Sequence, residues 1–173
     1  RPFAEAARRA APLDSEVQLV FGCVLEGIAE EKRLRHLESE IQAPTFRVLP
    51  GVASLLPALA ARGALLGLCT GNVIGGARLK LRRGGLDVHF SWEDGAVHGF
   101  AEDGEARELI VEAALRRASA RLGRKVDPRQ TVVIGDTPRD IRAAQAAGCP
   151  VVAVATGRFG VEDLRAEGAE AVV

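Results

Sequence analysis

The chain has 173 residues, enough for one domain with a sizeable buried core. It carries 23 Lys and Arg residues against 23 Asp and Glu residues, so nothing in its net charge favours a nucleic-acid or membrane partner. It has no apolar run of about 18 residues and no signal-like amino terminus, so we expect a soluble protein. The expected setting is the cytoplasm, and the expected state is a monomer or homodimer. We expect the three cysteines to be buried, reduced thiols, because their spacing is not that of a metal site: Cys23, Cys69 and Cys149.

The first part of the chain has the apolar spacing of amphipathic helices. Residues 1–43 are rich in Ala, Arg, Glu and Leu and show no strand pattern. Pro44 and Gly51 bracket a segment that interrupts this pattern. We therefore expect a small all-helical domain over residues 1–47 and a second domain over residues 48–173.

The second domain alternates apolar strands with amphipathic helices. The first predicted helix has Val52, Leu55, Leu56 and Leu59 on one face, with Ser54 as a possible N-cap and Gly63 just past its end. The other predicted helices are Ile74–Arg83, Leu109–Leu122, Pro138–Ala147 and Val161–Glu167. The predicted strands are Ala64–Cys69, Val88–Trp92, Thr131–Ile134, Val151–Ala155 and a final strand that starts at Val172. Such alternation predicts an α/β fold: a three-layer, doubly wound (Rossmann-like) parallel sheet with helices on both faces.

Two carboxylates follow the most clearly apolar strand. Asp136 comes after Gly135 at the strand's carboxyl end, where open α/β sheets bind their ligands. Asp140 lies four residues further on, in the first turn of a helix that Thr137 can cap. Paired carboxylates at a strand tip suit Mg²⁺ and therefore phosphate chemistry. The alternative is structural, with Asp136 as a helix N-cap and Asp140 as a favourable first-turn charge.

A second strand tip carries Thr70-Gly71-Asn72, and Lys80 follows in the next helix. A hydroxyl group and backbone amides at a helix start can hold a small anion, although ordinary capping explains the same residues. Lys80 lies about 9 Å along its helix, and helical side chains tilt toward the amino end, so it can reach back to Thr70. A solvated basic helix face explains Lys80 equally well. The tips of parallel strands share one edge, so we expect Thr70, Lys80 and Asp136 to meet there.

In this order and spacing the three features resemble the second, third and fourth motifs of the haloacid dehalogenase-like hydrolases. The resemblance covers residues 49–173, and residues 1–47 are similar to the helical cap of that family. The phosphoglycolate phosphatase-like branch fits best, because the cap precedes the second motif. The resemblance implies a hydrolase that cleaves the phosphate monoester of a small phosphorylated metabolite through an aspartyl-phosphate.

The resemblance also implies a role for each motif residue. Asp136 would ligate Mg²⁺, and Asp140 would support the metal shell or orient Lys80. Thr70, Gly71 and Asn72 would hold the phosphate, and Lys80 would neutralise it. Dehalogenases and phosphonate-cleaving enzymes of the same family remain open alternatives.

The chain departs from the family pattern at its first motif. The family has Asp-x-Asp after a central apolar strand, which supplies the nucleophile and the general acid, and no aspartate here follows such a strand. A sheet tolerates the loss of a central strand poorly, because its neighbours lose their hydrogen-bond partners. We therefore expect that strand and its aspartates to lie outside this sequence. The alternative is a catalytically silent module that binds phosphate and Mg²⁺.

Overall fold

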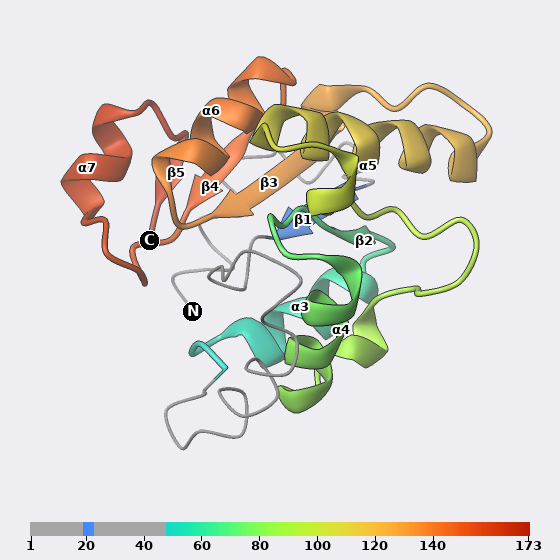
Figure 1. The fold of residues 1–173 in the computed structure, drawn as a ribbon. Helices are drawn as coiled ribbons and strands as arrows, with labels where there is room; N and C mark the ends of the chain where they lie inside the picture. The colour runs from blue at the N-terminus through green and yellow to red at the C-terminus, as the bar shows by residue number, and fades with distance from the viewer. Residues whose placement is uncertain (1–18, 23–47) are drawn as a thin grey trace.

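The computed structural model describes residues 19–22 and 48–173 of the chain (Figure 1). Within these ranges five strands form one parallel sheet, in the order β2-β1-β3-β4-β5. The strands are β1 (Leu19–Gly22), β2 (Leu65–Leu68), β3 (Thr131–Gly135), β4 (Val151–Ala153) and β5 (Ala171–Val172). The predicted α/β class and parallel sheet are confirmed.

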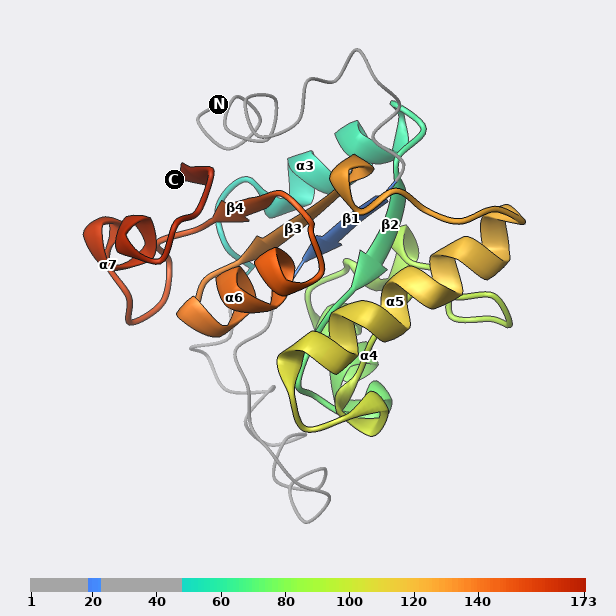
Figure 2. The same ribbon diagram turned by 90° about the horizontal axis from the view of Figure 1, so that it is seen from above.

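Helices cover both faces of the sheet. They are α3 (Val52–Ala60), α4 (Ile74–Arg83), α5 (Arg107–Leu122), α6 (Pro138–Ala146) and α7 (Val161–Ala166). Figure 1 shows α3 and α4 below the sheet and α5 and α6 above it, and Figure 2 shows α5 and α6 in front of the strands. Short 3₁₀ turns occupy Asp87–His89, Ala101–Asp103 and Pro128–Gln130. None of the helices in the described ranges is long and apolar enough to cross a membrane.

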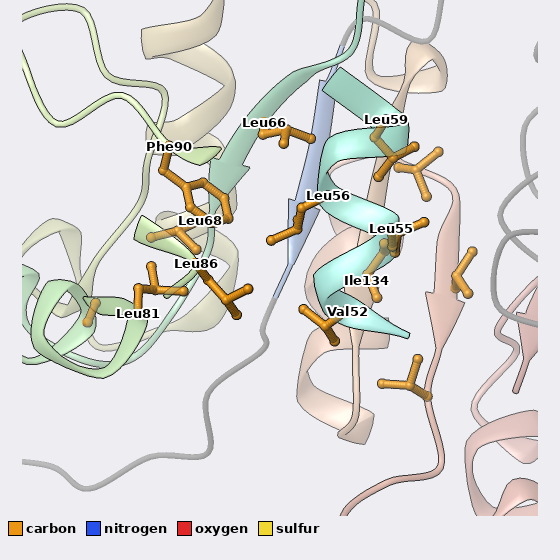
Figure 3. Close-up of a cluster of buried hydrophobic side chains, with 14 of the residues drawn as sticks. Val52, Leu55, Leu56, Leu59, Leu66, Leu68, Leu81, Leu86, Phe90 and Ile134 are labelled. Carbon is orange, nitrogen blue, oxygen red and sulfur yellow. The ribbon is translucent and has the colours of Figure 1, made fainter. Parts of the chain in front are cut away.

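Each face of the sheet has its own apolar core. On one face, side chains of α3 and α4 pack against β2 and β3 (Figure 3). On the other face, α5, α6 and α7 pack against β3 and β4. The two cores correspond to the two helix layers predicted from the alternating pattern.

One predicted strand is wrong. Residues 88–92 do not join the sheet and begin instead with the 3₁₀ turn Asp87–His89. Val88 is 78 % exposed, whereas Leu86 and Phe90 are buried in the core of α3 and α4. Leu86 and Phe90 anchor a loop here, and the apolar residues at positions 88, 90 and 92 have the alternating spacing of a half-buried strand.

The central position of the sheet is occupied by a strand from within this sequence. β1 lies between β2 and β3, in the middle of the sheet, and it falls inside the region predicted to be entirely helical. Four residues that pair with strands on both sides suffice to satisfy the backbone groups of β2 and β3. The rest of the predicted helical domain, with Cys23 and His36, lies outside the described residues.

Candidate active site

The predicted site residues lie at the carboxyl edge of the sheet, on either side of β1. Gly22 pairs with Leu68 of β2 and with Ile134 of β3. Thr70 and Asp136 each follow two residues later, so they leave the sheet at the same edge, two strand spacings or about 10 Å apart. The expectation that both tips share one edge is confirmed.

The loop before α5 fastens the tip of β2. The Gly99 amide donates to the Leu68 carbonyl at 2.7 Å, and the Thr70 amide donates to the Gly99 carbonyl at 3.1 Å. The Leu68 amide donates to Nδ1 of His98 at 3.1 Å. His98 is 2 % exposed, and burial lowers the pKa of its ring. A neutral ring is the form that keeps Nδ1 as an acceptor, so burial maintains this contact.

Thr70, Asn72 and Lys80 form a buried chain of hydrogen bonds. Thr70 and Asn72 are 2 % and 3 % exposed, and Lys80 is 7 % exposed. Nζ of Lys80 donates to Oδ1 of Asn72 at 3.2 Å, and Nδ2 of Asn72 donates to Oγ1 of Thr70 at 2.7 Å. The Lys80 side chain therefore does reach back toward Thr70, and its contact is with Asn72. A solvated helix face does not explain a lysine buried in this way.

Two backbone amides near the start of α4 have partners inside the protein. The Asn72 amide donates to Oγ1 of Thr70 at 3.2 Å. The Ile74 amide donates to Oε1 of Glu102 at 2.9 Å, so a carboxylate already occupies the positive end of this helix. The anion site predicted from a helix start therefore depends more on side chains than on these amides.

Asp140 lies in the first turn of α6 and is held by the N-cap residue of this helix. Its Oδ2 accepts from the Thr137 amide at 3.2 Å and from the Thr137 hydroxyl group at 2.7 Å, which completes a capping box. Thr137 is the N-cap, as predicted, so Asp136 is not the cap. Gly135 lies directly against Asp140, since a Cβ on Gly135 would collide with the Asp140 side chain. Asp136 is 9 % exposed at the strand tip.

Arg107 joins the two strand tips, and the sequence motifs did not identify it. Its Nε lies 3.0 Å from Oδ1 of Asp140. A Cβ placed on Gly71 would lie 3.2 Å from Nη1 of Arg107, so the guanidinium group also borders the Thr70–Asn72 turn. Asp140 therefore holds Arg107 in an ion pair, and Arg107 is a partner that the motifs did not include.

A signal for Arg107 is present in the sequence. Arg107 is the first residue of α5, where the helix dipole disfavours a cation. A basic residue at such a position indicates that another group holds it. The prediction that this helix begins at Leu109 left Arg107 outside it and hid the signal.

Magnesium usually binds through one or two carboxylates together with water and substrate phosphate. Both Asp140 oxygens have protein partners, and Asp136 lies two residues beyond Ile134 at the carboxyl end of β3. In the part of the chain that the structure describes, no three His, Cys, Asp or Glu side chains gather as a metal cluster.

Comparisons with known proteins agree with these features. The family described as HAD-hydrolase-like matches residues 104–173, which include Arg107, Asp136 and Asp140. A phosphoglycolate phosphatase of Rhodospirillum rubrum is 38 % identical over 125 residues, which cover 72 % of this chain and 48 % of the relative. The chain thus spans about half the length of this relative.

Solved structures show the same fold. A predicted phosphatase from Clostridium acetobutylicum superimposes with a TM-score of 0.58 at 25 % identity, covering 73 % of this chain and 55 % of the other. A haloacid dehalogenase-like family hydrolase from Streptococcus pneumoniae gives a TM-score of 0.62 at 17 % identity, covering 83 % and 67 %. With the motif residues at one sheet edge, these matches identify the chain as a member of the haloacid dehalogenase-like hydrolase superfamily.

Proposed function

We propose that this protein hydrolyses the phosphate monoester of a small metabolite, with water as co-substrate and an alcohol and inorganic phosphate as products. The observation that carries the proposal is the pair of cationic side chains at the Thr70–Asn72 turn. Lys80 is bonded to Asn72, and Arg107 is held beside Gly71 by Asp140. Two cations and a hydroxyl group around the turn that follows β2 match the charge and the oxygen atoms of a phosphoryl group.

Asp136 is the proposed magnesium ligand. A bound magnesium ion would withdraw charge from the phosphoryl oxygens and make phosphorus easier to attack. The support for this role is the position of Asp136 at the tip of β3, next to the capping box that engages Asp140. The proposed setting is the cytoplasm, with the protein acting as a monomer or homodimer.

A second candidate function is phosphate binding without turnover. Reaction through an aspartyl-phosphate needs a carboxylate that attacks phosphorus. The carboxyl end of the central strand is Gly22, which has no side chain, and Cys23 and Val24 follow it in the sequence. This edge position therefore contributes no carboxylate from β1, which favours a silent phosphate-binding module as the alternative.

One set of measurements separates the two functions. Turnover of a chromogenic phosphate monoester is followed with magnesium and with EDTA, and tungstate binding is measured by calorimetry on the same protein. Magnesium-dependent turnover that Asp136→Asn abolishes, and that the exposed control Asp94→Asn retains, supports the hydrolase. Tungstate binding without turnover supports the silent module. Absence of both contradicts the phosphate site itself.

A further inference from the structure

We propose that His98 is a positioning residue for the tip of β2, which it holds in place for a ligand only while its ring is neutral. The inference rests on the proposed function, because the ligand concerned is the phosphate that the Thr70–Asn72 turn would bind. In this role His98 acts through the backbone at the end of β2 and needs no contact with the ligand. The basis is the pattern of hydrogen-bond donors and acceptors around its ring.

Two backbone groups specify the protonation state of the His98 ring. The Leu68 amide can only donate, so Nδ1, 3.1 Å from it, has to be the unprotonated acceptor. The Ser91 carbonyl can only accept, so Nε2, 2.6 Å from it, has to carry the proton. A backbone group cannot exchange these roles, so the two contacts require a neutral ring with its proton on Nε2. A second proton, on Nδ1, would point at the Leu68 N–H group and break that contact.

Three aromatic side chains pack against the His98 ring and leave little water to solvate a charge. The ring centres of Trp92, Phe100 and Phe90 lie 5.1, 5.6 and 6.1 Å from that of His98. His98 is also 2 % exposed. Burying a charge among apolar groups is costly, so a second proton favours an arrangement in which the ring has left this position.

The charges around His98 also disfavour a second proton. Burial lowers the pKa of the ring, the hydrogen bond to Ser91 opposes this, and the charge of Arg117 lowers the pKa further. Arg117 reaches His98 from α5 and donates to its carbonyl at 2.6 Å, while Asp103 pairs with Arg117 at 2.7 Å and offsets part of its charge. The other charged side chains on this side are Arg78 of α4, which lies 5.3 Å from the centre of the Trp92 ring, and the exposed Glu93 and Asp94. The folded ring therefore takes up its second proton below pH 6.5.

The segment on which this ring stands also fixes the tip of β2. Gly99 donates to the Leu68 carbonyl and accepts from the Thr70 amide. The Ala101 amide donates to the Asn72 carbonyl at 3.1 Å. These bonds run from the end of β2 to the turn proposed to hold phosphate, so a displaced ring would pull on the backbone partners of Thr70 and Asn72.

Three variants isolate the effect of the proton. In His98→Gln the side chain still offers one acceptor and one donor, for Leu68 and Ser91, but it does not titrate between about pH 5 and 8. His98→Phe keeps a ring and removes both hydrogen bonds. His89→Gln is the matched control, because His89 is half-buried in a neighbouring 3₁₀ turn and does not contact β2 through its ring.

Trp92 reports the titration without any ligand. It is the only tryptophan of the chain, its ring lies 5.1 Å from that of His98, and a protonated imidazole quenches indole fluorescence. In the wild type and in His89→Gln the fluorescence should fall with a midpoint below pH 6.5 while the circular dichroism stays native, and in His98→Gln it should not. The NMR signal of the Thr70 amide should shift with the same midpoint. A Thr70 signal that stays in place while the fluorescence titrates would overturn the inference, as would a fluorescence change seen only together with unfolding.

Calorimetry with inorganic phosphate then tests the effect on the ligand. At about pH 7.5 the affinity of His98→Gln should lie within about threefold of the wild type, and His98→Phe should bind roughly 10-fold more weakly. Between about pH 7.5 and 5 the affinity should fall more steeply in the wild type and in His89→Gln than in His98→Gln. Equal pH dependence in the wild type and in His98→Gln would overturn the inference. If the wild type binds no phosphate while Trp92 and Thr70 respond as expected, the proposed function fails and the control of the β2 tip by His98 stands.

Discussion

Replacement of Arg107 by Met should destabilise the fold, because it leaves a buried carboxylate without its cation. The Asp140 side chain is 3 % exposed and that of Arg107 is 20 % exposed, with 3.0 Å between Nε and Oδ1. Removing one partner of a buried ion pair costs about 3–5 kcal/mol. Asp140 keeps two hydrogen bonds from Thr137, and Arg107 is partly solvated, so we expect a loss of about 2 kcal/mol in the free energy of unfolding.

Urea denaturation measures this loss directly, and in thermal unfolding it corresponds to a melting temperature lower by about 4–8 °C for a chain of this size. Arg165→Met is the matched control, because the pair of Arg165 and Glu162 is exposed and should contribute less than about 1 kcal/mol. The double variant Arg107→Met/Asp140→Asn should lose less than the sum of the single variants, because no unpaired charge remains. A loss for Arg107→Met no larger than that of the control would refute the reasoning.

Three further predictions concern pH, thiol reactivity and packing. Burial lowers the pKa of His98 below its ordinary 6.5, so on acidification the unfolded chain takes up a proton at this ring before the folded chain does. The free energy of unfolding should therefore fall as the pH drops below about 6.5. The fall should be steeper in the wild type than in His98→Gln, which urea titrations at several pH values would show. Burial raises the pKa of Cys149 to about 12, so a thiol reagent should modify Cys149 only after unfolding, which peptide mapping can check. Gly135→Ala should cost about 1–3 kcal/mol, because its Cβ would meet Asp140, whereas Gly75→Ala in open space should not destabilise the fold in the same urea assay.

The sequence predicted the core of the fold where local signals were strong. The apolar run of β3 ends at Gly135 and is followed by Thr137 and Pro138, and strand, cap and helix were each predicted at about the positions found. α4 was predicted with its observed bounds, Ile74–Arg83. In these segments local propensity and tertiary packing favour the same structure, and under that condition a single sequence is enough to predict its secondary structure.

The failures arose where tertiary contacts decide. Phe90 occupies a core position within a loop, so its alternating pattern predicted a strand that does not form. Arg107 belongs to no motif near the other site residues, and only the approach of α5 to the tips of β2 and β3 brings it to Asp140 and Gly71. A side chain that reaches the site from a distant helix leaves no spacing signal in the sequence.

The central strand shows how topology limits the chemistry. β1 is only four residues long and has a weak strand signal in its sequence. It forms a strand because the backbone groups of Leu65–Leu68 and Thr131–Ile134 offer hydrogen-bond partners on both of its sides. The identity of the residue at the end of β1 then decides whether this edge supplies its own nucleophile. Gly22 supplies none, while Lys80, Arg107 and Asp140 still bring charge to both neighbouring tips. In the proposed function, the phosphate-binding side chains therefore come from the tips of β2 and β3 and from α4 and α5, and none of them comes from β1.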